Sequence, residues 1–241
     1  MKVELLGAKI DALNMQETEN MVAGMVSRGR EGQVITLNPE YLYQAQYEPG
    51  LLDVANSAGV VTPDGEGIVW ACKTSGHPVP ERVTGIDLML RLVRRAAAEG
   101  WKVFLLGASP GVADAAAKKL SERFSGLQVV GTHHGYFKDD KDKEVLDRII
   151  AAGPDLLFVA LGAPRQELWI HRYLQQLNCV AMGVGGSFDV ISGHVQRAPL
   201  WTQRLKIEWF YRLVKEPTRW RRMMVLPKFA WLVTKKYRLK T

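Results

Sequence analysis

The sequence has little cysteine and no apolar run long enough to cross a membrane. Cys72 and Cys179 are the two cysteines among 241 residues, and both sit in apolar stretches. This argues against a disulfide framework and favours a reducing compartment. The N-terminal residues form no signal-peptide pattern, and no segment reaches the roughly 20 apolar residues of a membrane span. We therefore expect a cytoplasmic protein.

The chain also lacks internal repeats and low-complexity linkers, and its 47% hydrophobic content is that of an ordinary globular protein. Strand-like and helix-like patterns alternate over roughly the first 190 residues. Strands are predicted at residues 3–6, 33–37, 60–63, 101–107, 127–131 and 155–161, and from residue 180 onward. This alternation predicts an α/β fold, in which a Rossmann-like parallel sheet is flanked by helices and built with right-handed crossovers.

Asp64 is the first candidate catalytic residue. The short strand that ends at Pro63 leads directly to this carboxylate, and Gly65 and Gly67 follow. In an open α/β sheet, ligands bind at the carboxyl ends of the strands, so Asp64 is in position to act as a general base. Aspartate is also a preferred helix N-cap, and capping of the next helix is the alternative interpretation.

Polar residues and glycines follow several of the other predicted strands. They are Thr36, Asn38, Gly107, Tyr136, Gln166, Gly185 and Asp189. Because the carboxyl ends of parallel strands share one edge, we expect these residues to converge there. Tyr136 is suited to stacking on a base and Asp189 to accepting hydrogen bonds from a ribose or base. Gly107 lies in a turn that lacks the spacing of a dinucleotide fingerprint, so that signal alone is weak.

The C-terminal part of the chain is strongly basic. Residues 197–241 contain 13 Lys and Arg against two acids, a net charge of +11, whereas the rest has 19 basic and 23 acidic residues, a net charge of −4. Aromatic residues are interleaved with the cations, and Pro217 and Pro227 are predicted to divide the segment into short helices. We predict a Rossmann-like α/β domain at residues 1–195 and a basic helical appendage at 196–241.

Three interpretations of this appendage follow from its composition. Cations near anionic lipid contribute roughly 1 kcal/mol each, and Trp and Tyr favour the interfacial layer, so a membrane surface is one partner. Nucleic-acid binding uses the same composition. A helical cap packed on the sheet or on a partner subunit is the third. A lone arginine in a loop, Arg82, is on its own most simply a solvated surface charge.

Seven motifs in the same order resemble the WecG/TagA/CpsF glycosyltransferases. They are Thr36–Glu40, Pro63–Gly65, Pro80–Asp87, Gly131–Tyr136, Leu161–Glu167, Gly183–Asp189 and Arg197–Pro199. The resemblance covers nearly the whole chain. It implies a membrane-associated, inverting sugar transferase that acts on a lipid-linked acceptor in bacterial envelope synthesis, at the inner face of the cell membrane.

Within the family the chain most resembles the TagA branch. That branch is a hexosyltransferase group that moves N-acetylmannosamine (ManNAc) from UDP-ManNAc to undecaprenyl-diphosphate-linked N-acetylglucosamine (GlcNAc), in β-1,4 linkage, to make the linkage disaccharide of wall teichoic acid. The tail arginines favour this branch, because they align with arginines that complete the active site in TagA-like enzymes. They are Arg212, Arg219 and Arg222.

The resemblance also implies roles for single residues. Asp64 is the expected base, which takes the proton from the acceptor hydroxyl as that oxygen attacks the anomeric carbon. The residues expected to hold the sugar and the acceptor are Thr36, Asn38 and Gln166. The residues expected at the nucleotide are Tyr136, Asp189, Gly107 and Gly185. The residues expected to face the diphosphates are Arg82, Arg212, Arg219 and Arg222.

The sequence has no suitably placed Asp-x-Asp motif, with which many nucleotide-sugar transferases hold a metal. Asp64-Gly65-Glu66 resembles one only superficially, since two carboxylates at a helix start need not converge. Arginines can stabilise the departing UDP in place of a metal. We expect no metal and no cofactor, with UDP-sugar, undecaprenyl-diphosphate-GlcNAc and an anionic membrane surface as partners.

Two alternatives stay open beside this prediction. One is a related transferase that uses another UDP-sugar, such as ManNAc uronate or glucose, on a lipid-linked acceptor. The other is a non-catalytic nucleotide-binding or nucleic-acid-binding protein, which would not require Asp64. Nucleic acid is not the partner that we expect, and a homo-oligomer stays possible.

Overall fold

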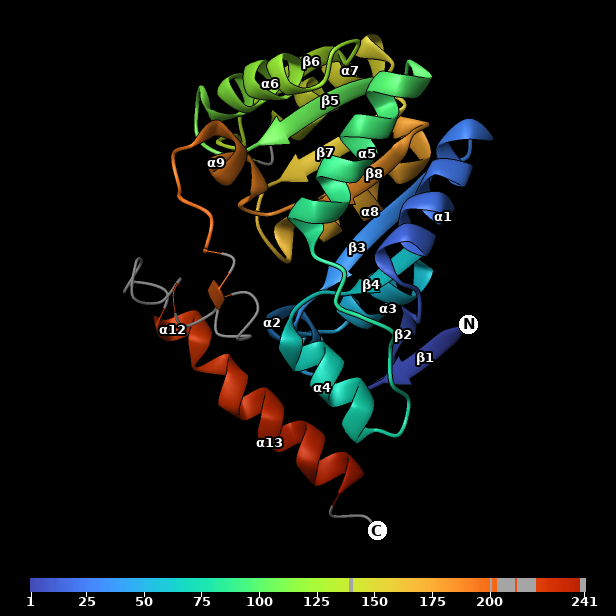
Figure 1. Cartoon of the computed structure of the whole chain (residues 1–241), viewed down its shortest axis with the longest axis vertical. Helices are drawn as coiled ribbons and strands as arrows, with labels where there is room; N and C mark the ends of the chain where they lie inside the picture. The colour runs from blue at the N-terminus through green and yellow to red at the C-terminus, as the bar shows by residue number, and fades with distance from the viewer. Residues whose placement is uncertain (139–140, 200, 203–210, 212–219, 239–241) are drawn as a thin grey trace.

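The computed structural model describes residues 1–138, 141–199, 201–202, 211 and 220–238, without the side chains of residues 221 and 222. Its centre is a six-stranded parallel sheet in the order β4-β3-β8-β7-β5-β6 (Figure 1). The strands are β3 (Gly32–Leu37), β4 (Val60–Pro63), β5 (Lys102–Gly107), β6 (Gln128–His133), β7 (Leu156–Ala160) and β8 (Val180–Gly183). The predicted α/β fold is confirmed.

Helices cover both faces of the sheet, which explains why its central strands are apolar runs without alternation. The helices that carry residues into the two face layers are α1 (Met15–Ser27), α2 (Pro39–Gln44), α3 (Leu51–Ser57), α4 (Glu66–Thr74), α5 (Gly85–Glu99), α6 (Val112–Arg123), α7 (Asp142–Ala152), α8 (Arg165–Leu177) and α9 (Ser187–Ser192). Neighbouring residues Val34 and Ile35 belong to opposite layers. Helices α1, α5, α6 and α9 share the Val34 layer, whereas α2, α3, α4, α7 and α8 pack on the other face.

An antiparallel hairpin precedes the sheet, and its second strand was not predicted. Strands β1 (Lys2–Leu5) and β2 (Ala8–Asp11) are joined at Leu6 and Gly7, both of which have positive φ. Asp11 is buried, and its carboxylate accepts the Val61 N–H at 2.9 Å. Strand β4 is the outermost strand of the sheet, and such a strand has backbone N–H groups without a neighbouring strand. The hairpin provides a hydrogen-bond acceptor for one of them.

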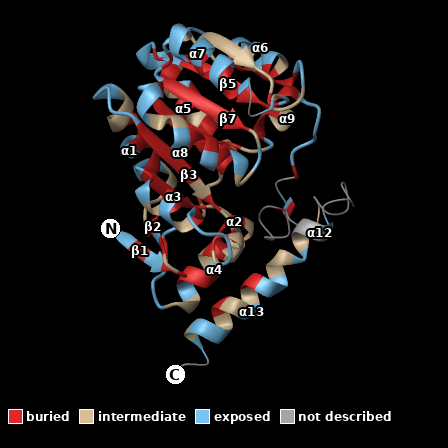
Figure 2. Ribbon diagram, turned by 180° about the vertical axis from the view of Figure 1, so that it is seen from behind, coloured by how far each residue is buried: buried red, intermediate tan, exposed pale blue. Residues whose placement is uncertain are grey.

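The described end of the chain forms α12 (Trp220–Met223) and α13 (Val225–Tyr237). Phe229 and Val233 of α13 are buried in the hydrophobic cluster shared with α2 and α4, and the hydroxyl of Tyr237 accepts the Leu6 N–H at 2.9 Å. The opposite side of α13 is exposed (Figure 2). This end of the tail is therefore a helix packed against the α/β domain.

The tail is divided into short helices near Pro227, as predicted, and Pro217 lies outside the described residues. Pro227 lies within the first turn of α13, and the break comes earlier, at Met224. A proline in the first turn costs no intrahelical hydrogen bond, so its missing N–H does not end the helix. Both cysteines are buried and unpaired. Within the described ranges, no helix is long and apolar enough to span a bilayer.

Candidate active site

The sheet topology points to a ligand site between β5 and β7. The chain leaves β5 toward β6 on one side, and it leaves β7 toward β8 on the other. Open α/β sheets bind ligands at such a switch point, outside the carboxyl ends of the strands. Gly107 ends β5 there with φ +130°, and a Cβ on it would lie 2.4 Å from the carbonyl oxygen of Ala160. Only glycine fits this close approach of the two strand ends.

A cavity of about 500 Å³ opens at this switch point. It is lined by Ala108, Gly135, Tyr136, Phe137, Lys138, Ala160, Leu161 and Arg165. Arg165, at the start of α8, donates to the carbonyls of Gly135 at 3.2 Å and Phe137 at 2.8 Å, and its guanidinium lies 5.0 Å from the Phe137 ring. This arginine therefore fixes the loop after β6, and sequence reasoning had given it no role.

Tyr136 sits on that loop with 71% of its surface exposed, so its ring is free to stack on a planar ligand. Its hydroxyl lies 3.4 Å from the hydroxyl of Ser109, in the loop after β5. The predicted nucleotide residues Gly107 and Tyr136 are thus on neighbouring loops beside one cavity of nucleotide size.

A second group of polar side chains gathers at the ends of β3 and β4. Asp64 follows β4, and its backbone N–H donates to the carbonyl of Leu37 at 2.9 Å. Its Oδ2 accepts from the N–H of Gly85, the first residue of α5, at 3.3 Å. A Cβ on Gly85 would lie 3.3 Å from the hydroxyl of Thr36. Thr36, Asp64 and the start of α5 therefore meet.

The alternative in which Asp64 caps the next helix is wrong. Helix α4 begins at Glu66, its N-cap is Gly65, and no side chain makes a capping hydrogen bond there. The Asp64 carboxylate instead turns toward α5. A carboxylate at a helix N-terminus is stabilised by the free N–H groups and by the helix dipole. The Asp64 carboxylate is thus held at the sheet edge.

Asn38 has a structural role that its predicted function did not include. It is the N-cap of α2, and its Oδ1 accepts the Tyr41 N–H at 2.9 Å. Pro39 begins that helix and packs against α4, where a Cβ on Gly67 would lie 2.7 Å from the proline ring. The contact of Asn38 with a substrate stays a prediction.

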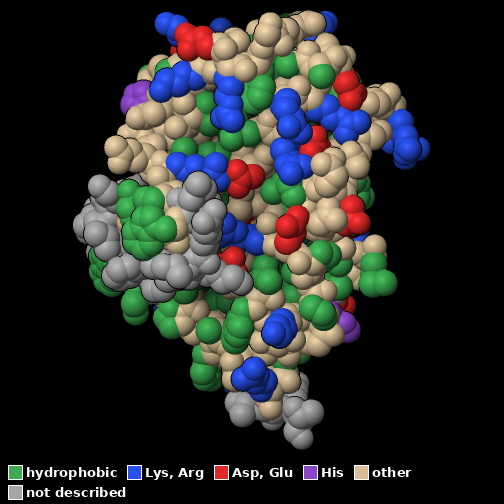
Figure 3. Space-filling model, in the orientation of Figure 1, with side chains coloured by type: hydrophobic (Ala, Val, Ile, Leu, Met, Phe, Trp, Pro, Cys, Tyr) green, Lys and Arg blue, Asp and Glu red, His purple; other side chains and the backbone are tan. Residues whose placement is uncertain are grey.

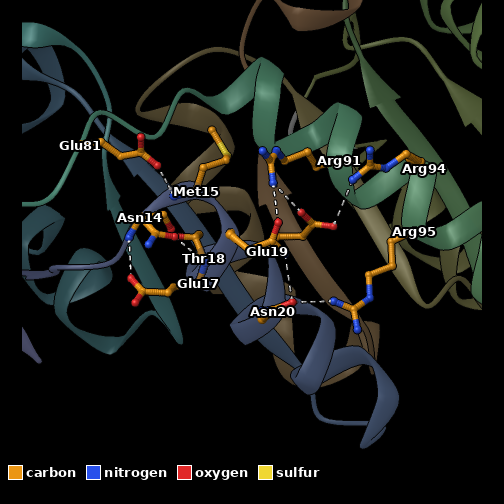
Figure 4. A network of polar contacts seen from close by, with 11 residues as sticks. Asn14, Met15, Glu17, Thr18, Glu19, Asn20, Glu81, Arg91, Arg94 and Arg95 are labelled. Atoms are coloured by element: carbon orange, nitrogen blue, oxygen red, sulfur yellow. Dashed lines mark hydrogen bonds and ion pairs between the residues drawn. The ribbon is translucent and has the colours of Figure 1, made fainter.

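Arg82 is not a solvated surface charge, since its side chain is only 18% exposed. Its Nε lies 3.9 Å from Oε1 of Glu66. The loop around it is anchored on both sides. Glu81 Oε1 accepts the Met15 N–H at 2.5 Å (Figure 4), and the Val83 N–H donates to the Pro63 carbonyl at 2.9 Å. This loop holds the guanidinium next to Glu66, the first residue of α4, which follows Asp64 by two positions.

Gln166 links the two loops that follow β7 and β8. Its Oε1 accepts the N–H groups of Gly162 at 3.2 Å and Gly185 at 3.1 Å, and its Nε2 donates to Glu167 at 2.8 Å. The side chain is buried, and a Cβ on Gly183 would lie 2.6 Å from its amide nitrogen. Gln166 therefore sets the position of the Gly185 loop, and direct contact with sugar stays a prediction.

Glu167 was missed as a site residue. It is 2% exposed, and burial raises the pKa of its carboxyl group to about 7. Gln33 of β3 donates to its backbone carbonyl at 2.9 Å. A carboxylate inside the apolar face of a helical pattern was the sequence signal that could have revealed this residue.

Gly185 and Asp189 lie in the middle of the edge. Gly185 has φ +51° in the turn before α9, and Asp189 is half-buried in the first turn of that helix. The ends of the edge are far apart, because five strand spacings of ~4.8 Å separate β4 from β6. The loop that carries Tyr136 returns from β6 to the cavity at the ends of β5 and β7, which are three to four strand spacings from β4, so about 14–19 Å separate it from Asp64 along the edge by this measure. The site therefore suits an extended ligand.

Some predicted residues cannot be located in this site. Arg212 and Arg219 lie outside the described residues, and the side chain of Arg222, in α12, lies outside them too. Among the described residues, no three His, Cys, Asp or Glu side chains form a group able to hold a metal ion.

A parallel α/β sheet with a cavity at its switch point and a carboxylate further along the same edge is an arrangement in which an enzyme can hold a ligand beside a general base. Comparison with known proteins gives the family. The model of the glycosyl transferase WecG/TagA/CpsF family matches residues 3–241. The chain belongs to this family and is a glycosyltransferase.

Three curated relatives share one name, N-acetylglucosaminyldiphosphoundecaprenol N-acetyl-beta-D-mannosaminyltransferase. The relative from Bacillus spizizenii is 41% identical over 84% of this chain and 78% of its own length. The relative from Bacillus subtilis is 36% identical over 94% and 85%, respectively. That from Staphylococcus aureus is 35% identical over 97% and 92%.

Proposed function

We propose that this enzyme transfers ManNAc from UDP-ManNAc to undecaprenyl-diphosphate-linked GlcNAc, forming a β-1,4 bond with inversion. The names of relatives that are 35–41% identical support this donor sugar and acceptor. The product is the linkage disaccharide of wall teichoic acid. The observation that carries the proposal is the Asp64 carboxylate, which sits at the carboxyl edge of the sheet beside Thr36.

The reaction is a single displacement. The acceptor hydroxyl oxygen attacks the anomeric carbon of ManNAc, and the bond from that carbon to the UDP oxygen breaks. UDP leaves with the bonding electron pair, and Asp64 takes the proton of the hydroxyl. Attack opposite the leaving group inverts the anomeric centre. General-base assistance of this kind contributes about a hundredfold or more to the rate.

The donor lies along the sheet edge. Its uridine occupies the cavity at the ends of β5 and β7, where Tyr136 stacks on the base and Gly107 allows close approach. Gly185 and Asp189, further along the edge, contact the ribose and diphosphate side. The sugar then reaches the Asp64 end. The strands that lie between Asp64 and the cavity lined by Tyr136 support such an extended placement.

Arginines stabilise the charge that UDP gains as it leaves. Arg82 is suited to this because its loop is anchored at Glu81 and Val83, so the guanidinium needs little reorganisation during the reaction. Arg212, Arg219 and Arg222 complete the set from the tail. With these fixed positive charges the enzyme needs no metal ion.

The tail also binds the inner face of the cell membrane, where the lipid-linked acceptor resides. Trp231 and Trp220 are each more than half exposed, and Lys235 lies 4.9 Å from the Trp231 ring. Hydrophobic side chains gather around α4 and α13 on the face seen in Figure 3. Exposed tryptophans beside lysines favour the layer of lipid headgroups.

The test is direct transfer of sugar from UDP-ManNAc to a short-chain lipid-diphosphate-GlcNAc, followed by mass spectrometry of the lipid product. A disaccharide product supports the proposal, and Asp64→Asn is expected to lose it. Transfer from UDP-glucose or UDP-ManNAc uronate, but not from UDP-ManNAc, would show that the donor is one of these other UDP-sugars. Absence of transfer from all three donors would contradict the proposed function.

A further inference from the structure

Two residues of the sequence motifs, Arg197 and Asp87, have no part in the proposed chemistry, yet they meet in the structure. Nη2 of Arg197 lies 2.6 Å from Oδ1 and 2.8 Å from Oδ2 of Asp87. Asp87 belongs to the first turn of α5, and Arg197 to the segment that descends from α9 toward the tail (Figure 1). The contact therefore joins the base of the tail to the start of α5.

On the helix side, the Asp87 carboxylate is fixed to the first turn. Thr84 is the N-cap of α5, its hydroxyl donates to Asp87 Oδ2 at 2.5 Å, and its oxygen lies 3.3 Å from the Asp87 N–H. A displacement of the Asp87 carboxylate therefore also displaces Thr84 and the first residues of the helix. Further along the helix, Arg91 and Arg94 hold α5 against Glu19 of α1 (Figure 4).

The same first turn holds the proposed general base. Gly85 is the first residue of α5, and its N–H contacts the Asp64 carboxylate at 3.3 Å. Its backbone also lies close to the hydroxyl of Thr36. A displacement of this turn therefore changes the direction and distance of the N–H that orients the carboxylate.

On the tail side, two described residues that follow Arg197 are buried. Ala198 is buried, and so is Thr202, whose N–H and hydroxyl both donate to the Pro199 carbonyl at 3.0 and 2.7 Å. Arg197 is thus the charged end of a packed turn, from which the basic tail continues.

We propose that Arg197 and Asp87 are a pair of positioning residues that couple the tail to Asp64 through the first turn of α5. The inference rests on the proposed function of Asp64 as the base. Breaking the pair slows the chemical step, because the carboxylate is no longer held in line with the acceptor hydroxyl. Binding of UDP-ManNAc changes little, since its nucleotide lies at β5 and β7.

The experiment compares Arg197→Ala and Asp87→Asn with a matched ion pair at the other end of α5. Arg95 and Glu99 have the same N to O distance, 2.6 Å, and similar exposure, with side chains 30% and 36% exposed against 36% and 37%. Arg95→Ala and Glu99→Gln are the controls. Turnover is measured with UDP-ManNAc and the lipid acceptor, and amide hydrogen exchange is measured over residues 85–88.

In the Arg197 and Asp87 variants, we expect kcat to fall about tenfold to a hundredfold while KM for UDP-ManNAc stays unchanged. Exchange at residues 85–88 should become faster, and Arg197→Lys should recover most of the turnover. The controls should match the wild type. Variants whose kcat and exchange equal those of the controls would overturn the proposal.

The two proposals fail in different ways. If the wild type transfers no sugar, the proposed function fails, and exchange at residues 85–88 still decides whether the tail base holds this turn. If the wild type is active and the Arg197 and Asp87 variants are equally active, the coupling is wrong and the proposed function stands.

Discussion

Asp64 and Gly85 meet across the carboxyl edge of the sheet, with the Gly85 N–H 3.3 Å from Oδ2 of the carboxylate. One residue ends the connection from β4 and the other begins α5. The contact directs the positive end of a helix at a carboxylate, which stabilises its negative charge. A general base must be ionised before it takes a proton, so this geometry suits the role proposed for Asp64.

Gly107→Ala should destabilise the protein strongly. The added Cβ meets the Ala160 carbonyl at 2.4 Å and the residue keeps φ +130°, so we expect a loss of about 3 kcal/mol or more in the free energy of unfolding. Gly111→Ala is the control, because Gly111 has φ +81° and open space around it. Its cost should be about 1–2 kcal/mol, from φ alone. The free energy of unfolding is measured by urea denaturation. Equal losses in the two variants would contradict the close approach of β5 and β7 at Gly107.

Gln166→Ala should weaken nucleotide binding without unfolding the chain. The substitution leaves the Gly162 and Gly185 N–H groups without their acceptor and frees the two loops from each other. We expect Kd for UDP to rise about tenfold, equivalent to about 1.4 kcal/mol. Isothermal titration calorimetry measures this. Gln44→Ala, which removes an exposed helix contact, is the control and should bind UDP normally. Unchanged affinity in Gln166→Ala would refute the bridging role.

Glu167 should make stability depend on pH. Burial raises its folded-state pKa from 4.5 to about 7, so the folded state binds more protons than the unfolded state between these values. The stability that this residue contributes is fully present below pH 4.5 and is lost as the pH rises from 4.5 to about 7. Glu167→Gln should remove that loss and gain up to about 3 kcal/mol relative to the wild type between pH 4.5 and 8. The free energy of unfolding of both proteins is measured as a function of pH. If it changed with pH in the same way in both, Glu167 would not titrate as described.

Truncation before Trp201 should abolish turnover, because it removes the tail arginines proposed to complete the active site. It should also expose apolar surface, since Phe229 and Val233 pack into the cluster of α2 and α4. We therefore expect a folded domain that self-associates, visible by analytical ultracentrifugation. A monomeric truncated protein with full activity on a short-chain soluble acceptor would contradict the closing role of the tail.

Much of the fold follows from the sequence. Val60 to Pro63 and the residues from Asp155 to Leu161 are apolar runs that end in turn signals, and the alternation with helices predicts the parallel sheet. The strand order does not follow from such local patterns. It places β8 and β7 between β3 and β5, so that Asp64 and the cavity lined by Tyr136 lie several strands apart on one edge. The sequence therefore predicts a shared edge but not the spread of the site along it.

Contacts between segments that are distant in the sequence could not be predicted from local patterns either. The pairing of Asp64 with Gly85 depends on how the loop after α4 returns to β4, and no local propensity encodes this path. Gln166 was predicted as a substrate residue, whereas its amide is seen bonded to two glycine loops. Its environment is set by the packing of α8 on β8, which the helical pattern of α8 alone does not reveal.

The most direct test of the account is transfer from UDP-ManNAc to lipid-diphosphate-GlcNAc, with the wild type and Asp64→Asn compared in excess chelator. The account predicts full wild-type turnover without metal, and a loss of about a hundredfold or more in kcat for the variant, with KM for the donor little changed. Turnover that disappears in chelator and returns with manganese or magnesium would contradict metal independence. An Asp64→Asn variant as active as the wild type would contradict the assignment of the base.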